Sequence, residues 1–325
     1  KIHNLLIDKA DWVSYVSKPL ESELNSRKDA IYLPNGVNPG ELNRTAYEIP
    51  QDLLPIVDKK SNGIITYFGY VSHWFDLNLL DVVSNERPDL DFVILGEVRE
   101  DISRFIQKKN VHFLGLKKYE DLPLYAQHTD IFIIPFKIDS VMDRVSPIKF
   151  YEYCAYGKPV ISTRMKELES SNGGAVSIVG TSDEFLERLN QLNTFELKDL
   201  AKRSLPQIAE NNTWLKRMEQ MQRVFAQQQR AIFNTDCYQK YDVIILSIID
   251  YDFRFQRPQH FAESFANDGH RVFYINVSLF KESSISEIKP NLNVVYLSKP
   301  DALSVHQYDW SDNLSEAVEH FDQLI

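Results

Sequence analysis

Short apolar runs rich in β-branched and aromatic residues alternate with longer polar-rich stretches through most of the chain. The runs have the length of buried strands, and the stretches between them are long enough for helices. This alternation is typical of a parallel sheet covered by helices, so the sequence predicts an α/β fold. The predicted strands lie at residues 12–16, 30–33, 64–68, 91–95, 111–113, 131–135 and 160–162.

Two polar-rich helical stretches, residues 186–205 and 214–229, close the first part of the chain, and residues 234–239 then break the pattern. A second series follows, with strands at 241–249, 271–275 and 292–297 and a helix from Ser311 onward. Three strands are fewer than the five or six of a doubly wound domain. The chain also starts without Met or a signal-peptide pattern. We therefore expect an incomplete second module and a piece of a longer polypeptide.

Residues 146–163, SPIKFYEYCAYGKPVIST, predict a short helix that leads into a buried strand. Ser146 suits the N-cap and Pro147 the first helical position, and Gly157 ends the helix.

Lys149 and Glu152 lie three residues apart, so they share one face of the first helical turns. The backbone N–H groups and the positive end of the helix dipole lie beside them. The arrangement suits a nucleotide diphosphate and its ribose.

Composition excludes several other classes of protein. The formal net charge of -10 argues against nonspecific nucleic-acid binding, which needs a basic field. Two cysteines, Cys154 and Cys237, are too few for a disulfide framework, so we expect a reducing, cytoplasmic setting. No apolar run approaches the roughly 20 residues that span a bilayer.

Glycine turns follow three of the predicted strands, at Gly69, Gly96 and Gly115, and the stretch 146–163 follows them along the chain. The order and spacing of these landmarks resemble the donor-binding C-terminal domain of GT-B fold glycosyltransferases, of the family 4 or group 1 type. The resemblance covers about residues 10–225. It implies Rossmann-like, doubly wound parallel sheets.

The resemblance also implies a domain organisation. Residues 1–40 resemble the tail of an acceptor domain with its crossover, Leu33 to Val37, and residues 41–235 the donor domain with its C-terminal helices. Residues 236–325 resemble the start of a second glycosyltransferase module. As a hypothesis, residues 1–40 and residues 236–325 pack together as one composite domain.

In family 4 a Glu-x7-Glu pair marks the donor site. Glu152 matches the second glutamate, which the resemblance places on the ribose hydroxyls, whereas Arg144 stands at the first position. Arg144 either faces the donor or is a solvated loop residue. The basic pair of the family is missing after Gly69, which leaves Lys149, with Arg144, to neutralise the diphosphate. Solvated or paired helix-face roles are the alternatives for Lys149 and Glu152.

The resemblance implies further donor-binding residues in the turns and at the helix start: Gly69, Tyr70, His73, Gly96, Gly115, Leu116, Tyr119, Ser146, Pro147 and Ile148. His73 has packing against Trp74 as its alternative, and Tyr119 an ordinary strand-to-helix turn. In the second module, Arg257 and Gln259 stand at a helix start after the first strand. They either face a phosphate or acceptor, or are ordinary polar residues of a helix start.

By resemblance, we expect a glycosyltransferase that transfers a sugar, with retention, from a nucleotide-sugar to a glycan or lipid-linked acceptor in surface-polysaccharide synthesis. The scheme needs no metal and no cofactor. Its other expected partners are a neighbouring module of the same polypeptide and, through the acceptor, the inner face of the membrane. The alternatives are a degenerate module that binds a sugar nucleotide without turnover and a nucleotide-sugar 2-epimerase.

Overall fold

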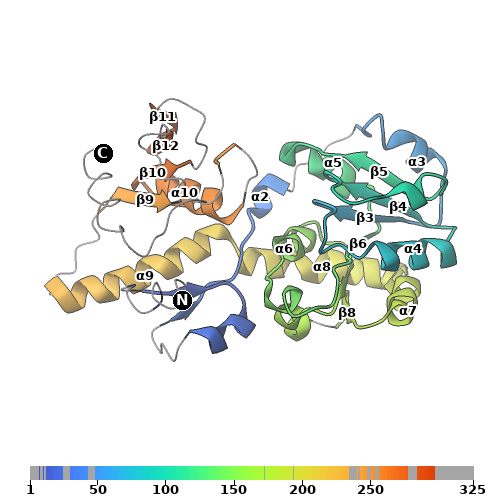
Figure 1. Cartoon of the computed structure of the whole chain (residues 1–325), viewed down its shortest axis with the longest axis horizontal. Helices are drawn as coiled ribbons and strands as arrows, with labels where there is room; N and C mark the ends of the chain where they lie inside the picture. The colour runs from blue at the N-terminus through green and yellow to red at the C-terminus, as the bar shows by residue number, and fades with distance from the viewer. Residues whose placement is uncertain are drawn as a thin grey trace. The chain divides into compact units, whose positions relative to one another are not determined.

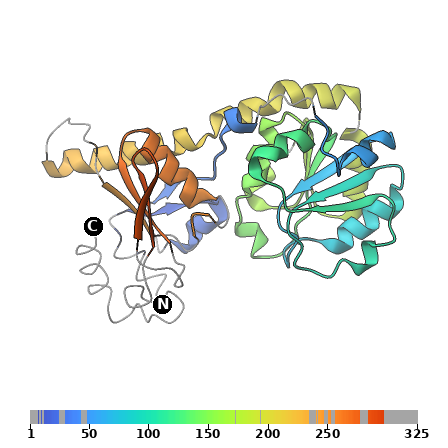
Figure 2. The ribbon, with the colours of Figure 1, turned by 90° about the horizontal axis from the view of Figure 1, so that it is seen from above.

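The computed structural model describes residues 7, 10, 12–24, 30–42, 48–171, 173–192, 194–233, 240, 242–246, 250–252, 256–276 and 284–296. Contacts divide the chain into two compact units, drawn in Figures 1 and 2. The first unit is Ser14–Thr213, and the second combines Lys1–Val13 with Trp214–Ile325. The modules 1–40, 41–235 and 236–325 and their composite packing stay predictions, because most of residues 1–11 and all of 297–325 lie outside the described residues.

A six-stranded sheet with the strand order β5-β4-β3-β6-β7-β8 is the centre of the first unit, and every neighbouring pair is parallel. Its strands are β3 (Ile64–Phe68), β4 (Asp91–Leu95), β5 (Val111–Gly115), β6 (Ile131–Ile134), β7 (Val160–Thr163) and β8 (Val176–Val179). Strands β3, β4, β6 and β7 are buried along their whole length, as expected for a parallel sheet covered on both faces.

Helices cover this sheet on both faces (Figures 1 and 2). They are α3 (Leu54–Asp58), α4 (Leu77–Glu86), α5 (Leu122–Ala126), α6 (Ile148–Ala155), α7 (Ser182–Leu192) and α8 (Phe195–Asn211). Helix α4 shows why such a segment folds: the Asp76 carboxylate caps it by accepting from the N–H groups of Asn78 and Leu79. Its face with Leu80 and Val83 is buried in the core.

The short elements of this unit lie mainly before β3 and after the strands. A two-stranded parallel sheet joins β1 (Ser14–Tyr15) to β2 (Ile31–Tyr32), and the short helix α2 (Pro39–Leu42) follows. The 3-10 helices are η1 (Lys18–Glu23), η2 (Ser103–Phe105), η3 (Tyr119–Asp121), η4 (Met142–Arg144) and η5 (Lys166–Ser171).

The strand order reverses direction between β3 and β6. From β3 the chain builds outward through β4 and β5, and it then returns to the other side of β3 with β6, β7 and β8. Such a reversal opens a crevice at the carboxyl ends of the two central strands, which is where open α/β sheets bind ligands. The segments that follow β3 and β6 therefore border the candidate site.

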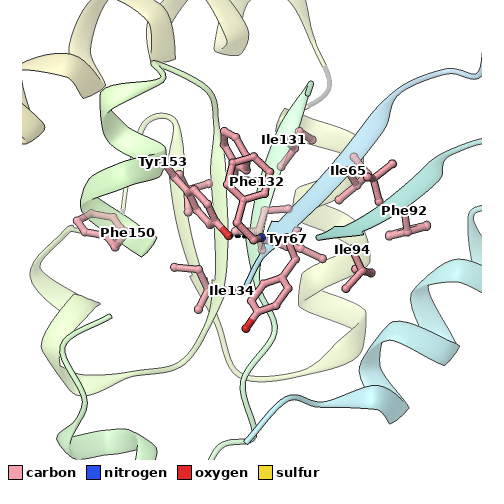
Figure 3. Close-up of a cluster of buried hydrophobic side chains, with 14 of the residues drawn as sticks. Ile65, Tyr67, Phe92, Ile94, Ile131, Phe132, Ile134, Phe150 and Tyr153 are labelled. Carbon is pink, nitrogen blue, oxygen red and sulfur yellow. Dashed lines mark hydrogen bonds between the residues drawn. The ribbon is translucent and has the colours of Figure 1, made fainter. Parts of the chain in front are cut away.

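Tyr153 of α6 packs over Phe132 of β6, and its hydroxyl reaches β3 (Figure 3). Strands β3 and β6 pair only near Ile65 and Thr66, and beyond this point the Phe68 N–H donates to the Tyr153 hydroxyl oxygen over 2.9 Å. The Tyr153 ring stacks on Phe132 with the two ring centres 4.1 Å apart. Because Tyr153 is fully buried, α6 is fixed to the switch point of the sheet.

The predicted elements of the first unit agree with this fold apart from one missed strand and one helix boundary. Strands β3 and β4 have the predicted bounds, but β8 was not predicted. The helical stretch predicted at 186–205 contains two helices, because α7 ends at Leu192 and the Thr194 hydroxyl caps α8 by accepting from the Leu197 N–H. The boundary is hard to predict from the sequence, since both helices show the same helical periodicity of apolar residues.

The second unit contains a four-stranded sheet with the order β11-β12-β10-β9. Its elements are α9 (Trp214–Phe233), β9 (Asp242–Leu246), α10 (Arg257–Asn267), β10 (Arg271–Ile275), β11 (Ser284–Lys289) and β12 (Leu292–Tyr296). Strand β10 is parallel to β9 and β12, whereas β11 is antiparallel to β12 and was not predicted. The helix predicted from Ser311 lies outside the described residues. Among the described helices, none has the length and apolarity to cross a membrane.

Candidate functional site

Glycine backbones close the carboxyl edge of the first unit's sheet. The Gly69 N–H donates to the Leu95 carbonyl over 2.7 Å, and the Gly96 N–H donates to the Gly115 carbonyl over 2.8 Å. All three glycines have positive φ, and a Cβ on Gly96 would overlap the carbonyl of Gly69. Only glycine permits this close approach, so the edge presents backbone where side chains would otherwise stand.

Lys149, in the first turn of α6, reaches across the switch point to this glycine edge. Its Nζ lies 2.7 Å from the position that a Cβ on Gly69 would occupy. The ammonium also lies 5.6 Å from the centre of the Tyr67 ring and 5.9 Å from that of Phe136. Aromatic faces attract a cation and keep its side chain in place. The structure thus puts a positive charge beside the half-buried backbone of Gly69, at the ligand-binding edge of the sheet.

The start of α6 differs from its prediction by one residue. Helix α6 begins at Ile148, and Pro147 is the N-cap, with extended backbone. The predicted capping role of Ser146 is wrong: its buried hydroxyl makes no hydrogen bond, because Pro147 and not Ser146 stands at the N-cap position. The Ser146 carbonyl instead accepts a 2.6 Å hydrogen bond from the side-chain amide of Asn35. The helix ends as predicted, with Gly157 at a φ of 63°.

Arg144 is occupied elsewhere. It ends η4, its side chain is 55% exposed, and its guanidinium lies 2.9 Å from the carboxylate of Glu23 in η1. This geometry agrees with the loop-residue alternative, and the catalytic role of Arg144 stays a prediction.

Glu152 is half-buried one turn after Ile148, near Tyr153 of α6 and Tyr156 at the C-cap of that helix. Burial raises the pKa of the Tyr156 hydroxyl, and the negative charge of Glu152 adds to the shift. The same two causes act on Tyr153, whose pKa lies well above its ordinary value. Both phenols therefore stay protonated, and Glu152 is the acidic group of this helix face.

The loop after β3 holds two of the predicted donor-binding residues. His73 is exposed and packs edge-on against Trp74 with the two ring centres 4.8 Å apart, which agrees with the packing alternative. Tyr70 is half-buried, and the Arg99 guanidinium lies 4.9 Å from its ring centre. Arg99 also pairs with Glu97. Contacts of His73 and Tyr70 with a donor stay predictions.

The turn after β5 is open. No atom lies within 4 Å of the position that a Cβ on Gly115 would occupy, and Leu116 is 66% exposed. Tyr119, at the start of η3, packs partly against the core. The open space at Gly115 leaves room for the predicted base pocket, whereas Tyr119 has the contacts of an ordinary turn residue.

The two residues predicted in the second unit lie at the start of α10. Gln259 is fully buried: its amide donates to the carbonyls of Asp250 and Tyr251, and its oxygen accepts from the N–H of Gln256. Arg257 packs over the Phe261 ring, and burial lowers its pKa to about 10. The contacts of Gln259 support the helix-start alternative for that residue.

Three residues of the site were missed by the sequence reasoning: Asn35, Tyr67 and Tyr153. Tyr153 had a signal, because it stands four residues after Lys149 and so shares its helix face. Asn35 and Tyr67 act through contacts that no local pattern shows. In the part of the chain that the structure describes, no three His, Cys, Asp or Glu side chains group as a metal site would require.

Comparisons with known proteins agree with this geometry. The family model of Glycosyl transferases group 1 matches residues 72–194, which run from the loop after β3 through α6 and β7 to α7. This segment is therefore similar to the group 1 glycosyltransferases. A Bacillus subtilis (strain 168) protein named as a teichuronic acid biosynthesis glycosyltransferase, TuaH, is 24% identical over 169 residues, which are 49% of this chain and 42% of TuaH.

Solved structures of GT-B glycosyltransferases share the fold. HepE of Anabaena, in complex with UDP and glucose, matches with a TM-score of 0.54 at 18% identity, over 68% of this chain and 64% of HepE. Sucrose-phosphate synthase from Thermosynechococcus elongatus matches with a TM-score of 0.53 at 15% identity, over 71% of this chain and 61% of the synthase. The chain thus spans less than two thirds of these relatives, and the predicted GT-B fold and glycosyltransferase resemblance are confirmed.

Proposed function

We propose that this chain carries the donor site of a nucleotide-sugar-dependent glycosyltransferase that acts in cell-surface glycan biosynthesis. The observation that carries the proposal is the Lys149 ammonium placed over the glycine edge at the switch point of the sheet. A diphosphate bound there would meet a fixed cation, backbone without side chains and the start of α6. The UDP and UDP-glucose complexes of HepE support a nucleotide-sugar as the donor.

The proposed reaction breaks the bond between the anomeric carbon and the diphosphate oxygen and forms one from that carbon to an acceptor hydroxyl. Negative charge develops on the leaving diphosphate, and Lys149 stabilises it in the transition state. In a retaining reaction the departing phosphate takes the proton of the acceptor hydroxyl. Glu152 binds the ribose hydroxyls, and the open space at Gly115 receives the base.

The acceptor in this proposal is a glycan or a lipid-linked glycan, used on the cytoplasmic side at the inner face of the membrane. The name of TuaH supports a surface-polysaccharide role. The proposal includes a neighbouring module of the same polypeptide as partner, and it requires no metal or other cofactor.

The second candidate is a module that binds a sugar nucleotide without turnover. One observation favours it: where family 4 carries a glutamate, this chain has Arg144, and Glu23 holds its guanidinium. The two candidates share a donor site and differ only in product formation.

A ligand screen followed by a transfer assay tests both. Thermal unfolding of the whole chain is measured with UDP, GDP, dTDP and CMP, and at least one should raise the midpoint, since a ligand of the native state stabilises it. The matching sugar nucleotides are then tested for hydrolysis or transfer. Binding with turnover supports the transferase, binding without turnover supports the second candidate, and stabilisation by none of the four contradicts both.

A further inference from the structure

We propose that Asn35 is a positioning residue for the donor site, which it serves by fixing the peptide that precedes α6. The inference rests on the proposed function and deepens it. Asn35 lies in the crossover segment 33–37, it is 7% exposed, and its side-chain amide donates to the Ser146 carbonyl over 2.6 Å. The two residues are 111 positions apart in the sequence.

The accepting carbonyl lies outside the hydrogen-bond ladder of α6. The first carbonyl that the helix uses is that of Pro147, which accepts from the Phe150 N–H over 3.1 Å. The Ser146 carbonyl precedes a proline, so its peptide has no N–H group to hold it in place. A buried carbonyl must be paired, and Asn35 is a donor that reaches it. The hydrogen bond therefore sets the plane of the peptide from which α6 starts.

The segment that carries Asn35 is itself anchored. Two residues later, the Val37 N–H donates to the Asn212 carbonyl over 3.0 Å, and Val37 forms a parallel bridge with Thr213. Helix α2, which follows, contacts both α6 and α8. The backbone of Asn35 is thus fixed, so its side-chain amide can restrain the position of the Ser146 carbonyl.

The orientation of the Ser146 peptide affects the position of Lys149, one helical turn later, at the glycine edge. Lys149 stands three residues after Ser146, and its ammonium lies against Gly69. A small rotation of the peptide before α6 moves the end of a long side chain, so a loss of the Asn35 hydrogen bond displaces the cation from the diphosphate site. Tyr153 fixes the next turn of α6 to Phe68, which leaves the first turn as the part that Asn35 controls.

Asn110 provides a matched control in the same unit. It is 8% exposed, and its side-chain amide donates to the Ser84 carbonyl over 2.9 Å. It lies just before β5, at the amino ends of the strands, opposite the site. The Asn110 amide also lies 3.3 Å from the carbonyls of Arg87 and Leu90. Removal of either amide takes the donor from at least one buried carbonyl, but only Asn35 contacts the α6 start.

The experiment compares Asn35→Ala, Asn35→Asp, Asn110→Ala and Asn110→Asp in the whole chain. Hydrogen exchange of the amides in residues 148–152 is measured without ligand, and UDP affinity is measured by calorimetry. The Asn35 variants should exchange about tenfold faster in these residues and bind UDP about tenfold more weakly. The Asn110 variants should lower the unfolding midpoint while leaving both quantities as in the unaltered protein. If an alanine variant does not fold, the corresponding aspartate variant takes its place, because aspartate has nearly the same side-chain volume as asparagine.

The outcomes separate the inference from the function on which it rests. Asn35 variants that behave like the Asn110 variants overturn the positioning role, and so does faster exchange with unchanged UDP affinity. If UDP does not bind the unaltered protein, the uridine donor fails, while the exchange comparison still decides whether Asn35 fixes the α6 start.

Discussion

Both units place a helix start at the carboxyl end of a parallel strand, yet the two ends are built differently. In the first unit, Gly69 and Gly96 bring backbone to the edge, and Lys149 lies over it. In the second unit, Gln259 fills the corresponding edge and bonds to the carbonyls of Asp250 and Tyr251. The strand-turn-helix pattern is thus shared, and the glycines decide which end leaves room for a ligand.

The largest expected effect follows from removing the cation of the first unit. Lys149→Ala should lower kcat/KM for sugar transfer by about 10²- to 10³-fold, because a fixed charge at the developing diphosphate is lost. Steady-state kinetics with the matching sugar nucleotide measure it. Lys158→Ala, beyond the other end of α6, is the control and should leave kcat/KM unchanged. Equal losses of kcat/KM in Lys149→Ala and Lys158→Ala would contradict a specific role for the cation at the start of α6.

Gly96→Ala tests the close approach of the Gly96 and Gly69 backbones. The added Cβ would overlap the Gly69 carbonyl at a φ of 152°, so the free energy of unfolding should fall by about 3 kcal/mol. Gly269→Ala in the second unit is the comparison, since its nearest atom, on Lys240, lies 3.6 Å away. It should cost about 1 kcal/mol, from its positive φ alone. Denaturant titration measures both, and similar costs would show that the glycine edge is not tightly packed.

Gln259→Ala tests whether the second unit's edge is structural. The carbonyls of Asp250 and Tyr251, the second of them buried, and the Gln256 N–H lose their partner, so the unfolding free energy should fall by about 2 kcal/mol. Hydrogen exchange across α10 should become faster. Nucleotide affinity should not change, and a weaker nucleotide affinity would instead give Gln259 the ligand role considered from the sequence.

The last expected effect, of about the same size, concerns pH. Burial lowers the pKa of His260, stacked on Trp214, from 6.5 to about 3. The unfolded chain therefore binds the extra proton between these values, and stability is lost as pH falls below 6.5. Between pH 7 and pH 5 the unfolding free energy should fall by about 2 kcal/mol more in the unaltered protein than in His260→Phe.

Denaturant titrations at pH 7 and pH 5 measure this fall in the unfolding free energy for the unaltered protein and for His260→Phe. Equal pH dependence in the unaltered protein and His260→Phe would show that His260 is not held neutral.

Much of the fold was predictable because its signals are local. Strands β3, β4 and β10 have the predicted bounds, since short β-branched runs between turn residues leave few alternatives. The missed strands lacked that signal: β8 is four residues long and follows two glycines, and β11 is exposed along its whole length. An exposed hairpin strand carries little apolar pattern.

The candidate site was predictable only in part. Lys149 and the three glycine turns could be found from their place after strands and at a helix start. The contacts of Arg144 with Glu23 and of Gln259 with two carbonyls could not, because each partner is chosen by packing. Polar residues at a helix start look alike in sequence, whether they face a ligand or hold a loop.

By itself, the sequence determined the α/β class, the order of the strands along the chain, and the turns that only glycine can make, because periodicity and backbone conformation are local properties. The tertiary structure decided which of these elements meet. It placed the Lys149 ammonium on Gly69, the Tyr153 hydroxyl on Phe68 and the Asn35 amide on Ser146. These contacts join segments about 80 to 111 residues apart, and only the packed fold brings them together.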